Sequence, residues 1–232
     1  MKIEVLFPDF CNLFGDLGNI KYLKQCLPEA EFIETKFDEE PRFVKEDVNL
    51  IYMGPTTEAM QEKVIKKLSP YKKRIEELIK KNVTFLMVGN AVEVFIDYIE
   101  NEDGTKIKGL NIFKDIYAKR YLMDRHNSFF VGKYEDIKLV GFKSQFTLLY
   151  GDNSKEYFAE VEKGIGLNKE SKLEGLRRNN FIGTYLIGPL LVLNPDFTLE
   201  FEKMIGVKEP KLAFEDEVRK CYEIRLKELS NK

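Results

Sequence analysis

Few residues in this chain could do nucleophilic chemistry. It contains three cysteines, Cys11, Cys26 and Cys221, and a single histidine, His126. A cysteine nucleophile needs a base such as histidine to form its thiolate, and none of these cysteines has the histidine near it in sequence. The odd number of cysteines, widely spaced and without a Cys-x-x-Cys pair, favours neither a disulfide framework nor a zinc site.

A glycine stands at a turn where many α/β enzymes hold their nucleophile. Residues 85–88 form an apolar run that predicts a buried strand, and a helix-like pattern begins after Gly89 and Asn90. A residue at a strand-to-helix elbow is forced into a strained conformation, often with positive φ, which glycine adopts without steric conflict. Taken alone, the stretch is better explained as an ordinary tight turn, because glycine is common at turns.

The elements that would position such a turn alternate along the first half of the chain. Apolar spacing predicts strands at residues 2–7, 31–37, 48–53 and 83–88. Helices are predicted at residues 17–27 and 58–81, the second broken or kinked at Pro70. Such alternation is typical of a parallel sheet with helices on both faces.

Beyond Gly104 the pattern changes to short strand-like pieces with short connections, which predict antiparallel strands at residues 129–134, 137–142, 146–150 and 156–161. The apolar run 180–193 is followed by a closing amphipathic helix at 215–229. Val218, Cys221, Tyr222 and Leu229 are expected on its apolar side. No repeat or linker divides the chain, so one α/β domain over 1–232 is expected.

Two segments contain glycines, asparagines and acidic residues at closely spaced positions. They are FPDFCNLFGDLGNIKYLKQCL at 7–27 and KGIGLNKESKLEGLRRNNFIGTYLIGPLLVLNP at 163–195. They resemble the N-L-Y-G-D-x-G-N-I and K-G-x-G-N-N…G-T-Y-L-H-G-P segments of class I glutamine amidotransferases of the cobyric acid synthase and lipid II isoglutaminyl synthase glutaminase-subunit type. FLMVGNAVEVF falls where that family has L-x-V-C-G-G-Y-Q. Residues 1–195 therefore resemble the family, and 196–232 are expected to form a C-terminal helical extension packed on them.

The resemblance implies a three-layer α/β fold, flavodoxin-like, with a mixed and mostly parallel sheet flanked by helices. It also implies glutamine hydrolysis by a cysteine that a histidine activates. In this chain the cysteine position is Gly89 and the histidine position is Ile187. At the family's oxyanion position the chain has Gly54-Pro55, and proline has no N–H to donate.

These departures leave three functions open. The leading hypothesis is a catalytically degenerate amidotransferase-like protein that binds or regulates a ligase or synthetase of the Mur-ligase type, in cell-wall or cobalamin biosynthesis. The second is an active amidotransferase or other small-molecule enzyme with a relocated nucleophile, Cys11 being the first candidate. The third is a small-metabolite-binding module. Whether the chain is an enzyme stays undecided, and the residues expected around a former pocket are Gly54, Pro55, Asn90, Asp16 and Asn19.

Charge balance and hydropathy limit the kinds of partner that the chain is expected to bind. The 37 Lys and Arg residues nearly balance 39 Asp and Glu residues, giving a net charge of −2, so no nucleic-acid partner is predicted. No apolar run reaches membrane-spanning length, and a cytoplasmic protein is expected. No cofactor or metal is predicted. The last helix could contact a partner, form a homodimer or pack on its own sheet, and His126 is expected in a polar loop.

Overall fold

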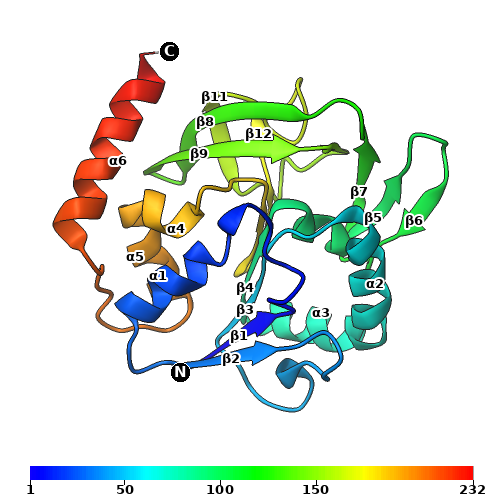
Figure 1. Cartoon of the computed structure of the whole chain (residues 1–232), viewed down its shortest axis with the longest axis horizontal. Coiled ribbons are helices and arrows are strands. Elements are labelled where there is room, and N and C mark those ends of the chain that lie inside the picture. Colours follow the sequence, from blue (N-terminus) through cyan, green and yellow to red (C-terminus); the bar gives the residue numbers. More distant parts are fainter. Residues whose placement is uncertain (232) are drawn as a thin grey trace.

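The computed structural model describes residues 1–231, and a six-stranded sheet lies at its centre (Figure 1). The strand order is β13-β14-β4-β3-β1-β2. All neighbouring strands pair in parallel except β13 and β14, so the mixed, mostly parallel sheet predicted from the sequence is confirmed. The strands are β1 Lys2–Leu6, β2 Glu31–Thr35, β3 Leu50–Met53, β4 Thr84–Val88, β13 Leu176–Arg178 and β14 Phe181–Thr184.

Helices cover both faces of this sheet (Figure 1). On one face lie α1 Gly18–Cys26, α4 Leu190–Leu193 and α5 Pro195–Met204; on the other lie α2 Glu58–Leu68 and α3 Lys72–Lys80. The predicted break at Pro70 is confirmed, because a short 3-10 helix, Ser69–Tyr71, separates α2 from α3. The side chain of Thr57 caps α2 by accepting a hydrogen bond from the Met60 N–H at 3.4 Å.

Two four-stranded sheets follow the central one, in the orders β10-β7-β5-β6 and β12-β11-β8-β9. The expected antiparallel pairing is confirmed for β8–β9 and β8–β11. Strand β7, which was not predicted from the sequence, pairs antiparallel with β10 and parallel with β5. The strands are β5 Ile96–Glu100, β6 Lys106–Lys108, β7 Phe113–Arg120, β8 His126–Tyr134, β9 Ile137–Gln145, β10 Thr147–Tyr150, β11 Ala159–Lys163 and β12 Leu173–Glu174.

The helix-like pattern after Gly89 is not an α-helix. Residues Gly89–Phe95 form a 3-10 helix that passes directly into β5. All but one of these residues are buried, so the segment lacks the polar face that a surface helix needs. Two shorter 3-10 helices, Leu13–Gly15 and Arg42–Val44, lie in the loops after β1 and β2.

The last helix, α6 Glu215–Ser230, lies along the outside of the molecule beside β8, β9, α4 and α5 (Figure 1, red). Val218 and Leu229 are buried, and the Tyr222 hydroxyl donates to the Lys138 carbonyl at 2.9 Å. Cys221 is exposed, so its assignment to the apolar side was wrong: it faces away from the strands. That 1–232 form one domain stays a prediction. Within residues 1–231, no helix is both long and apolar enough to span a membrane.

Candidate functional site

A cleft of about 280 Å³ opens at the C-terminal ends of β1, β3 and β4. Ligands of parallel α/β sheets gather at this edge because the loops that follow the strands converge there. Fourteen of the described residues line the cleft. They are Leu13 and Phe14 after β1, Pro55, Thr56 and Glu58 after β3, Gly89 and Asn90 after β4, Arg125 between β7 and β8, Ser144 and Gln145 at the end of β9, Phe146 between β9 and β10, Thr147 at the start of β10, and Tyr185 and Ile187 after β14.

Gly89 has a left-handed backbone, with φ of 62°. A side chain at this position would also meet a neighbour, because a Cβ atom on residue 89 would lie 2.7 Å from the Cβ atom of Pro55. Glycine is thus required here both by the backbone conformation and by the space that Pro55 takes.

Pro55 and its neighbours are tied firmly to the glycine turn. The side chain of Asn90 accepts from the Thr56 N–H at 2.9 Å and donates to the Thr56 carbonyl at 2.7 Å. The Pro55 carbonyl accepts from the Leu13 N–H at 3.0 Å. The Thr56 amide is therefore engaged within the protein, and Pro55 has none to offer a ligand.

Ile187 lies in the cleft at the end of the connection from β14. It is buried, and its N–H donates to the Phe142 carbonyl at 2.9 Å, which joins it to β9. No cysteine or histidine lines the cleft in the described chain.

The expectation that His126 lies in a polar loop was wrong, because His126 begins β8 and is buried. It lines a separate pocket, where its Nδ1 lies 4.0 Å from an oxygen of Asp124. Burial lowers its pKa, and the nearby Asp124 charge opposes this. The histidine packs edge-on against Tyr121 because strand pairing carries it into the interior.

Cys11 lies behind the cleft rather than in it. It is 1% exposed, and its carbonyl oxygen would be 2.7 Å from a Cβ atom on Gly54. Burial raises the pKa of the Cys11 thiol to about 12, so the thiol form dominates at neutral pH. Neither Cys11 nor Gly54 lines the cleft.

Asp16 and Asn19 are fully buried beside Cys11 and hold the loop after β1 in place. The Tyr52 hydroxyl donates to the Asp16 carbonyl at 2.8 Å, and Asn19 Oδ1 accepts from the Leu191 N–H at 2.9 Å. Neither carboxyl oxygen of Asp16 has a hydrogen-bond partner within residues 1–231, and burial raises its pKa to about 8. Of the residues predicted around the pocket, the structure thus brings Pro55, Asn90, Gly89 and Ile187 to the cleft, and leaves Asp16, Asn19 and Gly54 outside its lining.

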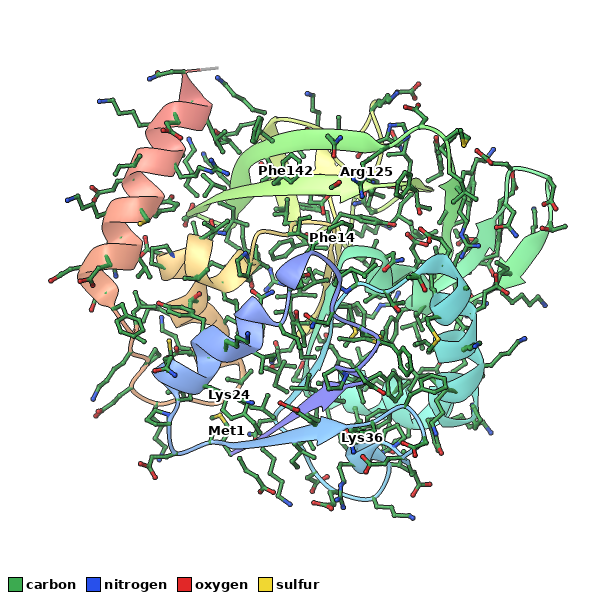
Figure 2. The ribbon with its side chains drawn as sticks, viewed as in Figure 1. Met1, Phe14, Lys24, Lys36, Arg125 and Phe142 are labelled. Carbon is green, nitrogen blue, oxygen red and sulfur yellow. The ribbon has the colours of Figure 1, made fainter. Side chains whose placement is uncertain are left out.

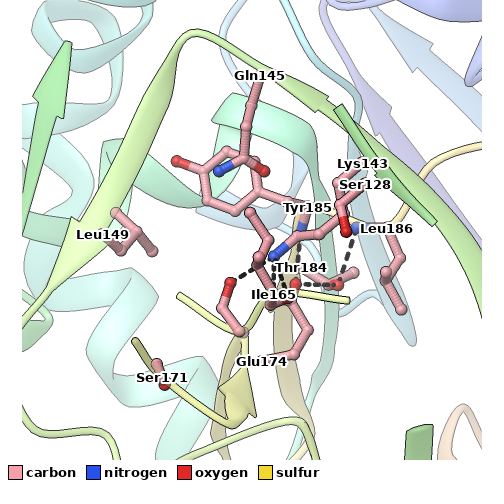
Figure 3. Close-up of polar contacts among 12 residues, drawn as sticks. Ser128, Lys143, Gln145, Leu149, Ile165, Ser171, Glu174, Thr184, Tyr185 and Leu186 are labelled. Carbon is pink, nitrogen blue, oxygen red and sulfur yellow. Dashed lines mark hydrogen bonds and ion pairs between the residues drawn. The ribbon is translucent and has the colours of Figure 1, made fainter. Parts of the chain in front are cut away.

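A buried polar network lies beneath the cleft on the β9 and β14 side (Figure 3). The Lys143 ammonium forms an ion pair with Glu174 and donates to the carbonyls of Ile165 and Gly166 at 3.2 and 2.6 Å. Glu174 Oε1 accepts from the Thr184 hydroxyl and the Tyr185 N–H, both at 2.9 Å. Burial lowers the pKa of Lys143, and the Glu174 carboxylate opposes this shift.

A second chain of hydrogen bonds extends from the Tyr185 ring. The Tyr185 hydroxyl donates to buried Glu93, which also accepts from Gln61 Nε2 at 2.9 Å. Arg120 donates to Gln61 Oε1 at 2.7 Å. The side of the cleft that carries Tyr185 is therefore held by charged groups that all have partners.

Sequence reasoning missed the charged residues of the cleft. Glu58 is in the first turn of α2, and Arg125 comes from the turn before β8. The Arg125 guanidinium carbon lies 5.7 Å and 4.9 Å from the ring centres of Phe14 and Phe146. No sequence signal marks these residues, because they belong to elements that meet only in the folded chain.

Comparison with known proteins identifies the family. The sequence model of the CobB/CobQ-like glutamine amidotransferase domain matches residues 2–195. The chain belongs to this family. The matched range includes Gly89, Pro55 and Ile187, so these three residues of the cleft lie inside the family domain.

Two curated relatives in this family are lipid II isoglutaminyl synthase (glutamine-hydrolyzing) subunits GatD. The one from Staphylococcus aureus (strain N315) is 26% identical over 200 residues, covering 85% of this chain and 81% of the relative. The one from Streptococcus pneumoniae (strain ATCC BAA-255 / R6) is 23% identical over 236 residues, covering 93% and 86%. A solved glutamine amidotransferase, 11% identical, superposes with a TM-score of 0.57 over 88% of this chain and all of that structure, which shows a shared fold.

Proposed function

We propose that this chain is a non-catalytic member of the CobB/CobQ-like glutamine amidotransferase family, acting as a binding or regulatory partner of a ligase or synthetase of the Mur-ligase type. Relatives that are subunits of a lipid II isoglutaminyl synthase support the partner, because a subunit acts within an assembly. They also favour cell-wall over cobalamin biosynthesis as the setting.

One observation carries the loss of catalysis: the space beside Gly89 is filled by Pro55. A thiol on residue 89 would need both a positive φ and the volume that Pro55 occupies. Ile187, at the position where the family resemblance places histidine, has an alkyl side chain that cannot accept a proton. The cleft thus lacks the nucleophile, the base and one backbone donor.

The main competitor is an active enzyme that uses Cys11. Its burial and raised pKa both disfavour a thiolate at neutral pH. Cys11 also does not line the cleft, although its thiol interacts with the side chain of Thr56, which does.

Intact-protein mass spectrometry after incubation with an electrophilic glutamine analogue tests this. We expect an unmodified mass, both for the chain alone and with a Mur-ligase-type protein from the same organism added, because some glutaminases become competent only in their assembly. An adduct on Cys11 that disappears in Cys11→Ser, together with glutamine hydrolysis that disappears in parallel, would refute a non-catalytic role. Failure of the two proteins to form a complex on gel filtration would instead refute the partner.

A further inference from the structure

The cleft contains two opposite charges that have no ionic partner. Arg125 contacts the rings of Phe14 and Phe146 but forms no ion pair within residues 1–231. Glu58 likewise forms no ion pair with any of the residues that the structure describes. Figure 2 shows Phe14 and Arg125 as neighbours from separate parts of the chain. Both charges line the cleft, so a ligand there meets a cation and an anion together.

The two carboxamides that line the cleft have little to offer a ligand. Both ends of the Asn90 amide are bonded to the Thr56 backbone. Gln145 Nε2 donates to the Thr147 carbonyl at 2.6 Å, and its Oε1 is covered by protein. These two carboxamides are therefore not free to bind a polar ligand side chain.

Apolar groups make up much of the remaining surface. Leu13, Pro55, Phe146 and Ile187 line the cleft, and the Tyr185 hydroxyl is already bonded to Glu93. The volume, about 280 Å³, is at the small end of the range for ligand sites. The size fits a small metabolite rather than a nucleotide or a peptide.

We propose that this cleft binds a free apolar α-amino acid as its zwitterion. Arg125 holds the α-carboxylate, Glu58 holds the α-ammonium group, and the side chain packs against Ile187 and Phe146. The inference rests on the proposed function, because it assigns the cleft to binding without turnover. Ile187, at the position where the family resemblance places histidine, gives the cleft an alkyl surface that favours an apolar ligand side chain.

Isothermal titration calorimetry with defined ligands tests each part of this assignment. We expect L-leucine or L-phenylalanine to bind, and L-glutamine to bind about tenfold or more weakly. L-Leucinamide lacks the carboxylate and 4-methylpentanoate lacks the ammonium group, so each should also bind about tenfold or more weakly than L-leucine.

Two charge-removing variants assign the groups. Arg125→Gln should weaken the binding of L-leucine by about tenfold or more but leave the affinity for L-leucinamide unchanged. Glu58→Gln should also weaken the binding of L-leucine by about tenfold or more, but leave the affinity for 4-methylpentanoate unchanged. Arg225→Gln is the matched control for the first, because Arg225 also lies over an aromatic ring, 5.8 Å from the centre of Phe129, without lining the cleft. Glu217→Gln, in the first turn of α6, is the control for the second.

Three results would overturn this assignment. L-Glutamine could bind as tightly as L-leucine or more tightly, neither apolar amino acid could bind at millimolar concentrations, or both charge variants could bind L-leucine with the affinity of the parent. Ammonia release is measured in the same samples. Hydrolysis of L-glutamine would refute the non-catalytic function itself, whereas an inert protein that binds no apolar amino acid would refute only the ligand.

Discussion

The two sides of the cleft differ in whether their buried polar groups have partners. On the network wall, which we define as Lys143, Glu174, Thr184 and Tyr185, every buried charge has a partner. The turn side, residues 7–19, 54–56 and 89–90, contains a buried carboxyl group without hydrogen bonds. It also contains four residues at positive φ: Phe7, Phe14, Gly15 and Gly89.

The two sides therefore differ in what they contribute: the network wall stabilises the fold, whereas the turn side carries the strain. Bulky residues at positive φ and unpaired buried groups cost free energy, and proteins retain them mostly near functional sites. The strain lies on the side that in the family resemblance carries the nucleophile and the oxyanion donor. The network wall lacks it and stabilises the contact between the small sheet and the central one.

Breaking the network wall should have the largest effect. Lys143→Met leaves Glu174 buried with an uncompensated charge, so we expect the free energy of unfolding to fall by about 3–5 kcal/mol. Urea denaturation measures this. Adding Glu174→Gln should recover much of the loss. Lys24→Met, which removes an exposed pair with Glu34, should cost less than about 1 kcal/mol, and an equal effect of the two lysine variants would contradict the comparison.

Filling the turn side should cost somewhat less. Gly89→Cys adds a left-handed non-glycine backbone, about 1–2 kcal/mol, and an overpacked contact with Pro55, about 1–3 kcal/mol. We expect the combined variant Pro55→Gly and Gly89→Cys to recover the second part only. A single Gly89→Cys as stable as the parent in urea would show that Pro55 does not exclude a side chain there.

The unpaired carboxyl group predicts a pH effect. Because the pKa of Asp16 in the folded chain, about 8, is above its usual value of 3.8, its contribution to stability is fully present below pH 3.8 and is lost as pH rises through 8. The loss between pH 5 and pH 7 should be about 2–3 kcal/mol. Asp16→Asn should remove this slope, whereas Asp136→Asn, at an exposed turn, should keep it. Parallel stability curves for parent and Asp16→Asn would be the contrary result.

The smallest expected effect on stability comes from the clamp between the two turns, by which we mean the two hydrogen bonds of the Asn90 side chain to the Thr56 backbone. Asn90→Ala leaves the Thr56 N–H and carbonyl without their partner, so we expect a loss of about 1–2 kcal/mol. Asn127→Ala on the exposed part of β8 is the control. Thermal unfolding of both should separate them, and an unchanged melting temperature for Asn90→Ala would show that the clamp adds nothing.

Local pattern was enough to predict much of the fold. The apolar runs of β1, β3 and β4 and the proline between α2 and α3 are signals within single segments, and the structure confirms them. The family resemblance placed Gly89, Pro55 and Ile187, which the structure brings into one cleft.

What could not be predicted depends on contacts between distant segments. Lys143 and Glu174 are 31 positions apart, and nothing around either residue announces the ion pair. His126 was expected in a loop because its neighbours are polar, yet pairing of β8 with β9 buries it opposite Gln145. The 3-10 helix after Gly89 was misread because an apolar run alone does not distinguish a surface helix from a buried segment.

The packing of Pro55 on Gly89 also bears on mutational history. On the proposed function, a return to catalysis requires a cysteine at 89, a histidine at 187 and an open backbone amide at 55. A cysteine introduced first collides with the proline, and a proline removed first leaves a protein without a nucleophile. Each single substitution therefore gives an intermediate without glutaminase activity, and the contact between Pro55 and Gly89 makes a return to catalysis by single steps unfavourable.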